Sequence, residues 1–269
     1  MIQTIITGED STFSEYLTKV WQHRSFILTL AKRDLKIKYA QTALGFAWSI
    51  VQPLTAVIVF TLFFNVLMDM QTTYPYALFV MSGVLCWGLF NYIFSHGSTS
   101  LINNLDLIRK LSFPKIILPI SKVVVGAVEF LFTLLLLIPM FIWAEIPLSW
   151  NILFFPVVIF FIILFSLGVS LILAASTLRY RDLQHIIPFL VNFGIWFTPV
   201  FYPVSLIPEQ YMDFIYINPM ASLIGLFRWS VFGDPISYLA ISGMLIAVIF
   251  LIIGVVYFKR VEDRIFEIV

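Results

Sequence analysis

Side chains that could do chemistry are few in this sequence, and the densest group of them is basic. Arg33, Lys36 and Lys38 lie close together and are followed directly by Tyr39. A guanidinium binds phosphate oxygens through its planar fork and an ammonium binds them as a point charge, so this cluster could hold a pyrophosphate. The alternative is an ordinary basic anchor on anionic lipid at the membrane edge, which suits each lysine equally well.

One carboxylate and one histidine stand alone inside long uncharged stretches. Glu129 interrupts Val123 to Ala144, and His96 interrupts Met70 to Leu105. Both are expected about six residues, or roughly 9 Å, from the same membrane face. Because an unpaired carboxylate costs about 2.5 kcal/mol or more at the membrane centre, we expect His96 and Glu129 to form an intramembrane pair. A protonated Glu129 bonded to backbone, or one exposed to a transport path, is the alternative.

Other chemistry has little support in the sequence. It contains no phosphate-binding loop of the form G-x-x-x-x-G-K-[ST], no H-E-x-x-H and no Gly-x-Ser-x-Gly. The histidines at positions 23, 96 and 185 lack partners at metal-ligand spacing, so we expect no metal site and no cofactor bound by this chain. A net charge of +1 gives no field to attract nucleic acid. The single cysteine, Cys86, excludes an internal disulfide.

The elements that position these residues must lie in a membrane. The chain is 61% apolar and 12% charged, against about 45–50% and 25% in ordinary soluble domains. A helix of roughly 20 apolar residues crosses a bilayer, and backbone in hydrocarbon must be helical or closed into a barrel. We therefore predict an all-α polytopic membrane protein, a single domain over residues 1–269. Its six transmembrane helices are expected at 44–68, 76–101, 123–143, 152–177, 186–203 and 236–258.

Basic residues predict the orientation of these helices. If the loops alternate between the two sides, fifteen of the 16 Lys and Arg lie on one face and only Arg228 on the other. The positive-inside rule makes the first face cytoplasmic, so both termini are predicted inside. No short apolar core follows Met1, so we expect no cleaved signal peptide.

Residues 11–24 predict an amphipathic helix before the first span. Thr12 and Glu15 fit a capping box. The apolar residues recur on one helical face and are Phe13, Tyr16, Leu17, Val20 and Trp21. Such a helix lies in the membrane interface, and the alternative is a soluble helix packed on a partner.

Prolines divide the segment before the last span into short pieces. A piece of about ten residues is roughly 15 Å long, half a bilayer. Asn218 followed by Pro219 is typical of a helix N-cap and first position. We therefore predict two re-entrant outer helices in 204–233, an outer gate that includes Pro208, Asn218, Pro219 and Arg228. A surface loop is the alternative.

Polar and aromatic residues share faces of three predicted spans, which indicates contact with protein or water rather than lipid. The predicted path-lining residues are Trp48, Gln52, Trp87, Asn91, Asn192, Trp196 and Tyr202. Their four aromatic rings could stack on sugars. Because Trp and Tyr also form belts at membrane interfaces, we expect two of the four to be belt residues.

The cytoplasmic segment 103–113 predicts a short amphipathic helix. Asn103 and Asn104 could cap it, and Pro114 would end it. Its apolar side and flanking charges are Leu107, Ile108, Arg109, Lys110 and Leu111. This pattern suits a groove on a partner protein, and the alternative is a loop that anchors to lipid headgroups.

Several segments together resemble a known family. In chain order they are Arg33-Asp34-Leu35-Lys36-Ile37-Lys38-Tyr39, Leu44-Gly45, Trp48, Pro53-Leu54, Arg109-Lys110-Leu111-Ser112-Phe113-Pro114-Lys115, Leu118-Pro119, Tyr180-Arg181-Asp182-Leu183, Thr198-Pro199-Val200-Phe201-Tyr202-Pro203 and Asn218-Pro219 followed by Arg228. This order resembles permeases of bacterial ATP-binding-cassette exporters for O-antigen, capsule or teichoic acid. The family commonly has Ser-Pro-Val where this chain has Thr198-Pro199-Val200, which keeps the hydroxyl.

The resemblance implies a homodimer of this subunit bound to two copies of a separate ATPase, which would carry ATP and Mg. It implies outward transport of a lipid-diphosphate-linked glycan across the bacterial cytoplasmic (inner) membrane, and it makes the ATPase the partner of segment 103–113. Six helices can hardly enclose a path for a hydrated glycan, and the missing phosphate loop requires an ATP-hydrolysing partner if transport is active. A passive channel subunit or an intramembrane transferase is the alternative function.

Overall fold

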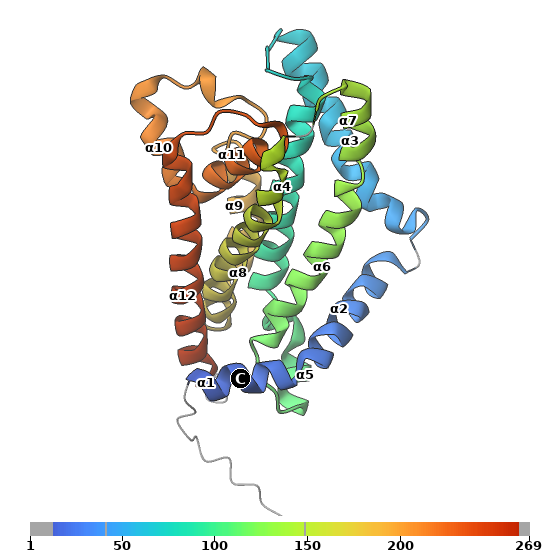
Figure 1. Ribbon diagram of the computed structural model, residues 1–269. Helices are drawn as coiled ribbons and strands as arrows, with labels where there is room; N and C mark the ends of the chain where they lie inside the picture. The colour runs from blue at the N-terminus through green and yellow to red at the C-terminus, as the bar shows by residue number, and fades with distance from the viewer. Residues whose placement is uncertain (1–12, 41, 148, 264–269) are drawn as a thin grey trace, which may run out of the picture.

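The computed structural model describes residues 13–40, 42–147 and 149–263, and the regular structure within these ranges is helical (Figure 1). Five helical stretches are long and apolar enough to cross a membrane, which makes this a polytopic membrane protein. They are Gly45–Leu67, Tyr76–Ser98, Ile117–Ala144, Trp150–Arg179 and Tyr238–Glu262. They match the first four predicted spans and the last one.

The five stretches differ in regularity. The first consists of a short 3-10 turn, α3 (Trp48–Phe60) and a π-helical end, and the second is α4 (Tyr76–Ser98). The third joins α6 (Ile117–Leu134) to α7 (Leu137–Ala144). The fourth is dominated by α8 (Phe155–Arg179) and the last by α12 (Ser242–Glu262).

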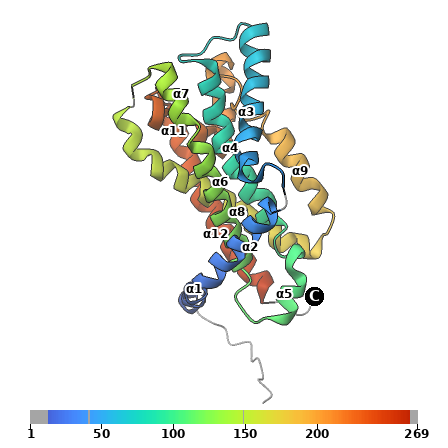
Figure 2. The same ribbon diagram turned by 90° about the vertical axis from the view of Figure 1, so that its right-hand side faces the viewer.

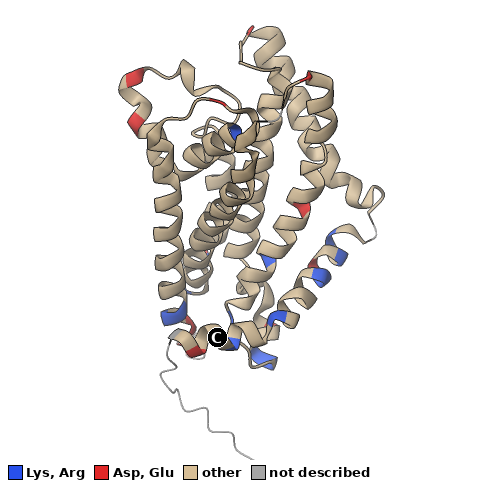
Figure 3. Ribbon diagram, viewed as in Figure 1, with Lys and Arg blue, Asp and Glu red and all other residues tan. Residues whose placement is uncertain are grey.

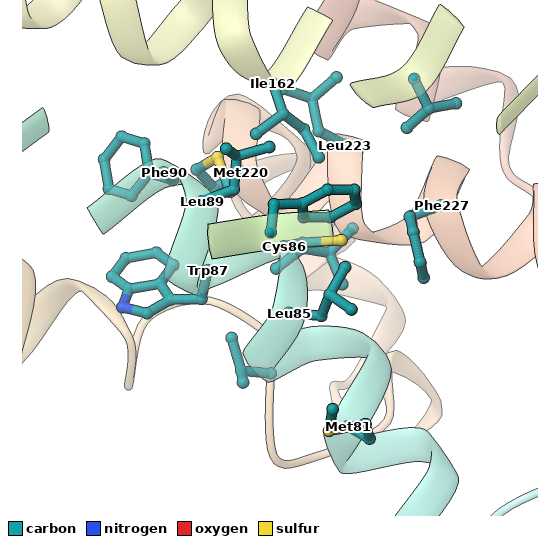
Figure 4. Packing of buried hydrophobic residues seen from close by; sticks show 14 of the residues in the cluster. Met81, Leu85, Cys86, Trp87, Leu89, Phe90, Ile162, Met220, Leu223 and Phe227 are labelled. Carbon is teal, nitrogen blue, oxygen red and sulfur yellow. The ribbon is translucent and has the colours of Figure 1, made fainter. Parts of the chain in front are cut away.

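Helix α4 lies at the centre of the bundle. Within its most apolar window 78% of residues are buried, compared with 6% for the stretch that contains α3. Its side chains Met81, Leu85 and Cys86 are fully enclosed, packed with residues of α8 and α11 such as Ile162 and Phe227 (Figure 4). The remaining helices are therefore arranged around α4.

The fifth predicted span, 186–203, is wrong as a continuous helix. Helix α9 (Leu183–Gly194) ends early, and turns follow through Tyr202. Pro199 has no N–H and disfavours helical angles at Thr198, so a regular helix cannot continue through this segment to 203. Helix α9 lies on the flank of the bundle (Figure 2).

The N-terminal region contains two helices rather than the single one predicted at 11–24. Helix α1 (Phe13–Gln22) is followed after His23 by α2 (Arg24–Tyr39), which runs diagonally along α6 (Figure 1). Thr12 of the predicted capping box lies outside the described residues. On α1, Tyr16 is buried whereas Trp21 is exposed, so the helix rests on the bundle with part of its apolar face free.

The two predicted re-entrant helices have different environments. Helix α11 (Pro219–Phe232) is packed inside the bundle, and Asn218 caps it as predicted by accepting a hydrogen bond from the Met220 N–H at 3.0 Å. Helix α10 (Met212–Ile217) is short and has no buried residue. Pro208 is exposed and precedes a 3-10 turn at Glu209–Tyr211.

Basic residues are unevenly distributed along the bundle. Lys and Arg gather in its lower half, where α1 and the end of α12 both lie, whereas Asp and Glu occur in both halves (Figure 3). Among the described residues, the exception is a basic residue of α11, Arg228, in the upper half. This distribution agrees with both described ends lying on the cytoplasmic side.

Candidate functional site

A cavity of about 480 Å³ lies between α2, α3, α4, α6 and the turns after α9. Five of the seven predicted path residues line it, and these are Trp48, Gln52, Trp87, Asn91 and Trp196. They come from three separate segments of the chain. The polar and aromatic stripes therefore meet in one place, and a transport role for the cavity stays a prediction.

Asn192 and Tyr202 do not line this cavity. Asn192 is exposed on α9, and the Tyr202 hydroxyl donates a hydrogen bond to the Trp196 carbonyl at 3.2 Å. We expected Asn192, Trp196 and Pro199 to share one helical face of the fifth span. Because α9 ends at Gly194, that face is interrupted and only Trp196 reaches the cavity.

The polar end of the cavity is built around Glu129. Its Oε1 accepts hydrogen bonds from Lys38 Nζ at 2.6 Å and from the Tyr39 hydroxyl at 3.1 Å, and Tyr39 also lies 2.6 Å from Ser49 Oγ. The pKa of Tyr39 is raised to about 12. Burial is the main cause, the hydrogen bond with Ser49 acts against it, and the charge of Glu129 adds to it. The Tyr39 hydroxyl therefore stays protonated at neutral pH and acts as a donor.

The predicted pair of His96 and Glu129 is replaced by the contact of Glu129 with Lys38. Both residues line the cavity, but His96 stacks on the Tyr92 ring with centroids 4.2 Å apart, and its Nδ1 lies 3.1 Å from the Tyr92 carbonyl oxygen. Helix α6 begins at Ile117, so Glu129 lies about 18 Å along it rather than 9 Å. At this level along α6, the neighbouring side chain that can pair with Glu129 is Lys38 of α2.

The basic cluster on α2 does not converge on one point. Arg33 binds Asp34 at 2.9 Å and donates to Asn104 Oδ1 at 3.0 Å, and Asp34 also binds Lys122 of α6. Lys36 is exposed. Of the predicted entrance residues, only Lys38 and Tyr39 line the cavity, because α2 uses Arg33 and Asp34 to pack against the rest of the bundle.

The predicted coupling helix exists in shorter form as α5 (Leu105–Lys110). Leu107 is half-buried, and Ile108 is 2% exposed and packs inside with Leu101 and Phe113. The prediction that Ile108 forms part of an outward apolar knob is therefore wrong. Of the five predicted coupling residues, Arg109, Lys110 and Leu111 are exposed.

Asn104 does not cap α5 with its side chain. Its amide donates to the Ser100 carbonyl at 2.8 Å and its oxygen accepts from Arg33. The helix ends at Lys110 because Leu111 is extended, with φ −128° and ψ 138°. The asparagine thus joins the start of α5 to α2.

Arg228 has a role that the sequence did not predict. Its guanidinium is buried and donates to the carbonyls of Pro199, Val200 and Phe79 at 2.8, 3.1 and 3.2 Å, and to Ser82 Oγ at 3.1 Å. It also lies 3.6 Å from the Phe79 ring centroid. The arginine therefore joins α11, α4 and the turns after α9. Its solitary position on the outer side was the available signal, because charge at membrane depth is costly without partners.

A second unpredicted contact lies at the lower end of the bundle. Glu262 at the end of α12 accepts a hydrogen bond from the Tyr16 hydroxyl at 2.5 Å and one from the backbone N–H of Lys115. Burial and the neighbouring Glu262 raise the pKa of Tyr16. This contact fixes α1 and the loop before α6 to the end of the chain's last long helix.

Among the described residues, no group of three His, Cys, Asp or Glu side chains could hold a metal ion. The features present are membrane-length helices, a cavity lined by tryptophan and polar side chains, and a charged pair at its edge. They define a polytopic membrane protein with a cavity between its helices.

The family model of the ABC-2 type transporter matches residues 25–232, and the chain belongs to this family. It is 34% identical over 76% of its length to the O-antigen export system permease protein RfbA of Myxococcus xanthus, covering 79% of that protein. RfbA of Klebsiella pneumoniae is 29% identical, with 90% of this chain and 94% of the relative covered. The polysialic acid transport protein KpsM of Escherichia coli is 21% identical, with 86% and 91% covered.

The predicted resemblance to exporter permeases is confirmed by these matches. The chain is the membrane-spanning subunit of an ABC-type transporter, and its sequence has no phosphate-binding loop for ATP. ATP hydrolysis in such a transporter belongs to a separate ATPase subunit.

Proposed function

We propose that this chain is the membrane subunit of an ATP-driven exporter that moves a lipid-diphosphate-linked polysaccharide out across the bacterial cytoplasmic membrane. The relatives named for O-antigen export and polysialic acid transport support a glycan of the O-antigen or capsule type. The single observation that carries the proposal is the cavity, in which three tryptophans converge with amide and charged side chains.

The composition of the cavity suits a sugar. Trp48, Trp87 and Trp196 supply flat rings, and Gln52 and Asn91 supply amides that can donate to and accept from hydroxyls. Its volume of about 480 Å³ falls within the usual range for ligand sites. Trp87 is buried whereas Trp48 and Trp196 are partly exposed, so the three rings extend from the interior of the chain to its surface.

The assembly is a homodimer with two copies of the ATPase. In this arrangement α9 and the turns that follow it form the fifth of six crossings, and both termini lie inside. The exposed Phe189 and Phe193 of α9 give that crossing an apolar outer face. Arg109, Lys110 and Leu111 at the end of α5 are placed on the cytoplasmic side, where they can contact the ATPase.

The test is complementation of a strain that lacks this gene, with surface glycan as the readout. Trp87→Ala and Trp196→Ala should each reduce export several-fold, because each removes a ring from the cavity. Trp150→Ala is the matched control, since Trp150 is 90% exposed and lies away from the cavity. Normal export by both cavity variants would contradict the proposed path. Copurification of the chain with an ATPase, followed by subunit counting, tests the stoichiometry.

A further inference from the structure

Lys38 lies at the edge of the cavity with a carboxylate of the same chain as its partner. Its Nζ is 2.6 Å from Glu129 Oε1, and its ammonium lies 4.8 Å from the centroid of the Tyr92 ring. The Lys38 side chain is 39% exposed and that of Glu129 is 17% exposed. The positive charge that reaches the cavity is therefore neutralised by an anion already in place.

This ion pair differs from the other one between α2 and α6. Asp34 binds two cations, Arg33 and Lys122, and the side chains of Asp34 and Lys122 are only 13% and 12% exposed. Asp34 does not line the cavity, whereas Lys38 and Glu129 do. The first contact fastens the helices, and the second can open towards the cavity without separating them.

Glu129 keeps a hydrogen bond when Lys38 leaves. Lys38 Nζ and the Tyr39 hydroxyl both donate to Glu129 Oε1, and the Tyr39 hydroxyl is also hydrogen-bonded to Ser49. Lys38 is in turn held near the cavity by the faces of Tyr39 and Tyr92. Each partner thus has a residual contact, which lowers the cost of exchanging the ion pair.

We propose that Glu129 is a resident counterion that an anionic phosphate headgroup displaces from Lys38 as the substrate enters. This rests on the proposed function, which supplies a lipid diphosphate as the substrate. A diphosphate carries more charge and more acceptor oxygens than a carboxylate, so it competes for the ammonium where a neutral headgroup cannot. Glu129 thereby acts as a specificity-determining residue, because it makes headgroup charge a condition for binding.

The experiment uses the purified complex with its ATPase in nanodiscs, and it measures binding of a short-chain polyprenyl diphosphate by quenching of tryptophan fluorescence. Glu129→Gln keeps the acceptor for Tyr39 and removes the competing charge. Since a partly exposed ion pair changes affinity by about 1.4- to 5-fold, the Kd should fall by a factor in this range. Lys38→Gln should raise the Kd. A purely structural pair would weaken binding in both variants.

A double variant distinguishes competition for Lys38 from general repulsion of the ligand. In the Lys38→Gln background, Glu129→Gln should bring no gain, because there is no ammonium left to release. Asp106→Asn is the control, since it removes one negative charge from an exposed side chain of α5 outside the cavity and should leave the Kd within about twofold. A gain that persists without Lys38, or an equal gain in Asp106→Asn, overturns the proposal.

The headgroup is identified by three ligands of equal chain length, which are a polyprenyl diphosphate, the monophosphate and phosphatidylglycerol. The wild-type protein should bind the diphosphate with the lowest Kd, and Glu129→Gln should reduce the difference in Kd between the diphosphate and the other two ligands. An equal gain for phosphatidylglycerol would mean an ordinary anionic-lipid site and would overturn the proposal. Wild-type binding of the diphosphate with no change in Glu129→Gln overturns the counterion role alone. Absence of wild-type binding, together with normal surface glycan in the deletion strain, overturns the proposed function as well.

Discussion

Replacement of Arg228 by methionine tests whether the buried guanidinium holds the outer half of the bundle together. The variant loses four hydrogen bonds, three of them to the carbonyls of Pro199, Val200 and Phe79. The Phe79 carbonyl retains the Ser82 hydroxyl as a donor at 2.6 Å. The Pro199 and Val200 carbonyls lose the arginine as their donor in a buried position, where water does not readily replace it.

The magnitude follows from these two carbonyls. Burial of a guanidinium costs several kcal/mol, which is recovered in the variant and is similar in size to the charge-assisted bonds that are lost. What remains is the cost of leaving two buried acceptors without a donor, about 1–3 kcal/mol each and about 2–6 kcal/mol together. At the lower limit of 2 kcal/mol, the fraction of molecules whose outer half has opened rises about 30-fold. The stability of Arg228→Lys should lie between that of the unmodified protein and that of Arg228→Met, because an ammonium restores donors without the planar fork.

The assay uses Cys86, which is the single cysteine of the chain and is fully buried in α4. Its reaction with a thiol-reactive dye in detergent reports opening of the core directly. In Arg228→Met the labelling rate should rise by at least about 30-fold at dye concentrations where the core opens and closes faster than the thiol reacts, because the rate then follows the open population. A rate within twofold of the unmodified protein would show that the carbonyls find other donors, and would refute the reasoning.

Two further substitution pairs test the packing and the surface of α5. Gly83→Ala should accelerate labelling of Cys86, because the new Cβ would lie 2.8 Å from the Val200 carbonyl oxygen and 3.0 Å from the Arg228 guanidinium. Gly88→Ala on the same helix is the control and should leave the labelling rate unchanged, because its Cβ would meet no atom within 4 Å. Leu111→Asp should leave membrane insertion intact and lower the ATP hydrolysis that accompanies export, because this side chain is 48% exposed. Ile108→Asp should instead reduce the yield of folded protein, since Ile108 is 2% exposed; equal yields of the two variants would contradict this assignment.

Features encoded by neighbouring residues could be predicted from the sequence. The helix predicted at 76–101 is observed as Tyr76–Ser98, because a long apolar run in a membrane must satisfy its backbone internally. The start of α11 at Pro219 was equally predictable, since Asn218 and Pro219 form a local capping signal. The stripes that contain Trp48 and Trp87 were identified by helical spacing alone, and both reach the cavity.

Features that depend on distant partners could not be predicted in this way. Helix α2 carries six charged residues, and ion pairs with α6 help to fasten it to the bundle. Without α2 in place, Glu129 had no visible partner except His96. Likewise, Ile108 fits an outward or an inward face equally well, and only its packing against Phe113 and Leu101 decides between them.

The basic cluster shows how one set of residues can serve two purposes that the sequence could not separate. The positive-inside rule counts Lys and Arg near a span regardless of their partners, so Arg33, Lys36 and Lys38 contribute equally to the predicted orientation. In the structure Arg33 is taken up by Asp34 and Asn104, and Lys38 reaches the cavity beside Glu129. Lys36 stays exposed on α2, where a lipid headgroup can approach it. The two interpretations of the cluster, lipid anchor and phosphate site, therefore stay predictions, the first for Lys36 and the second for Lys38.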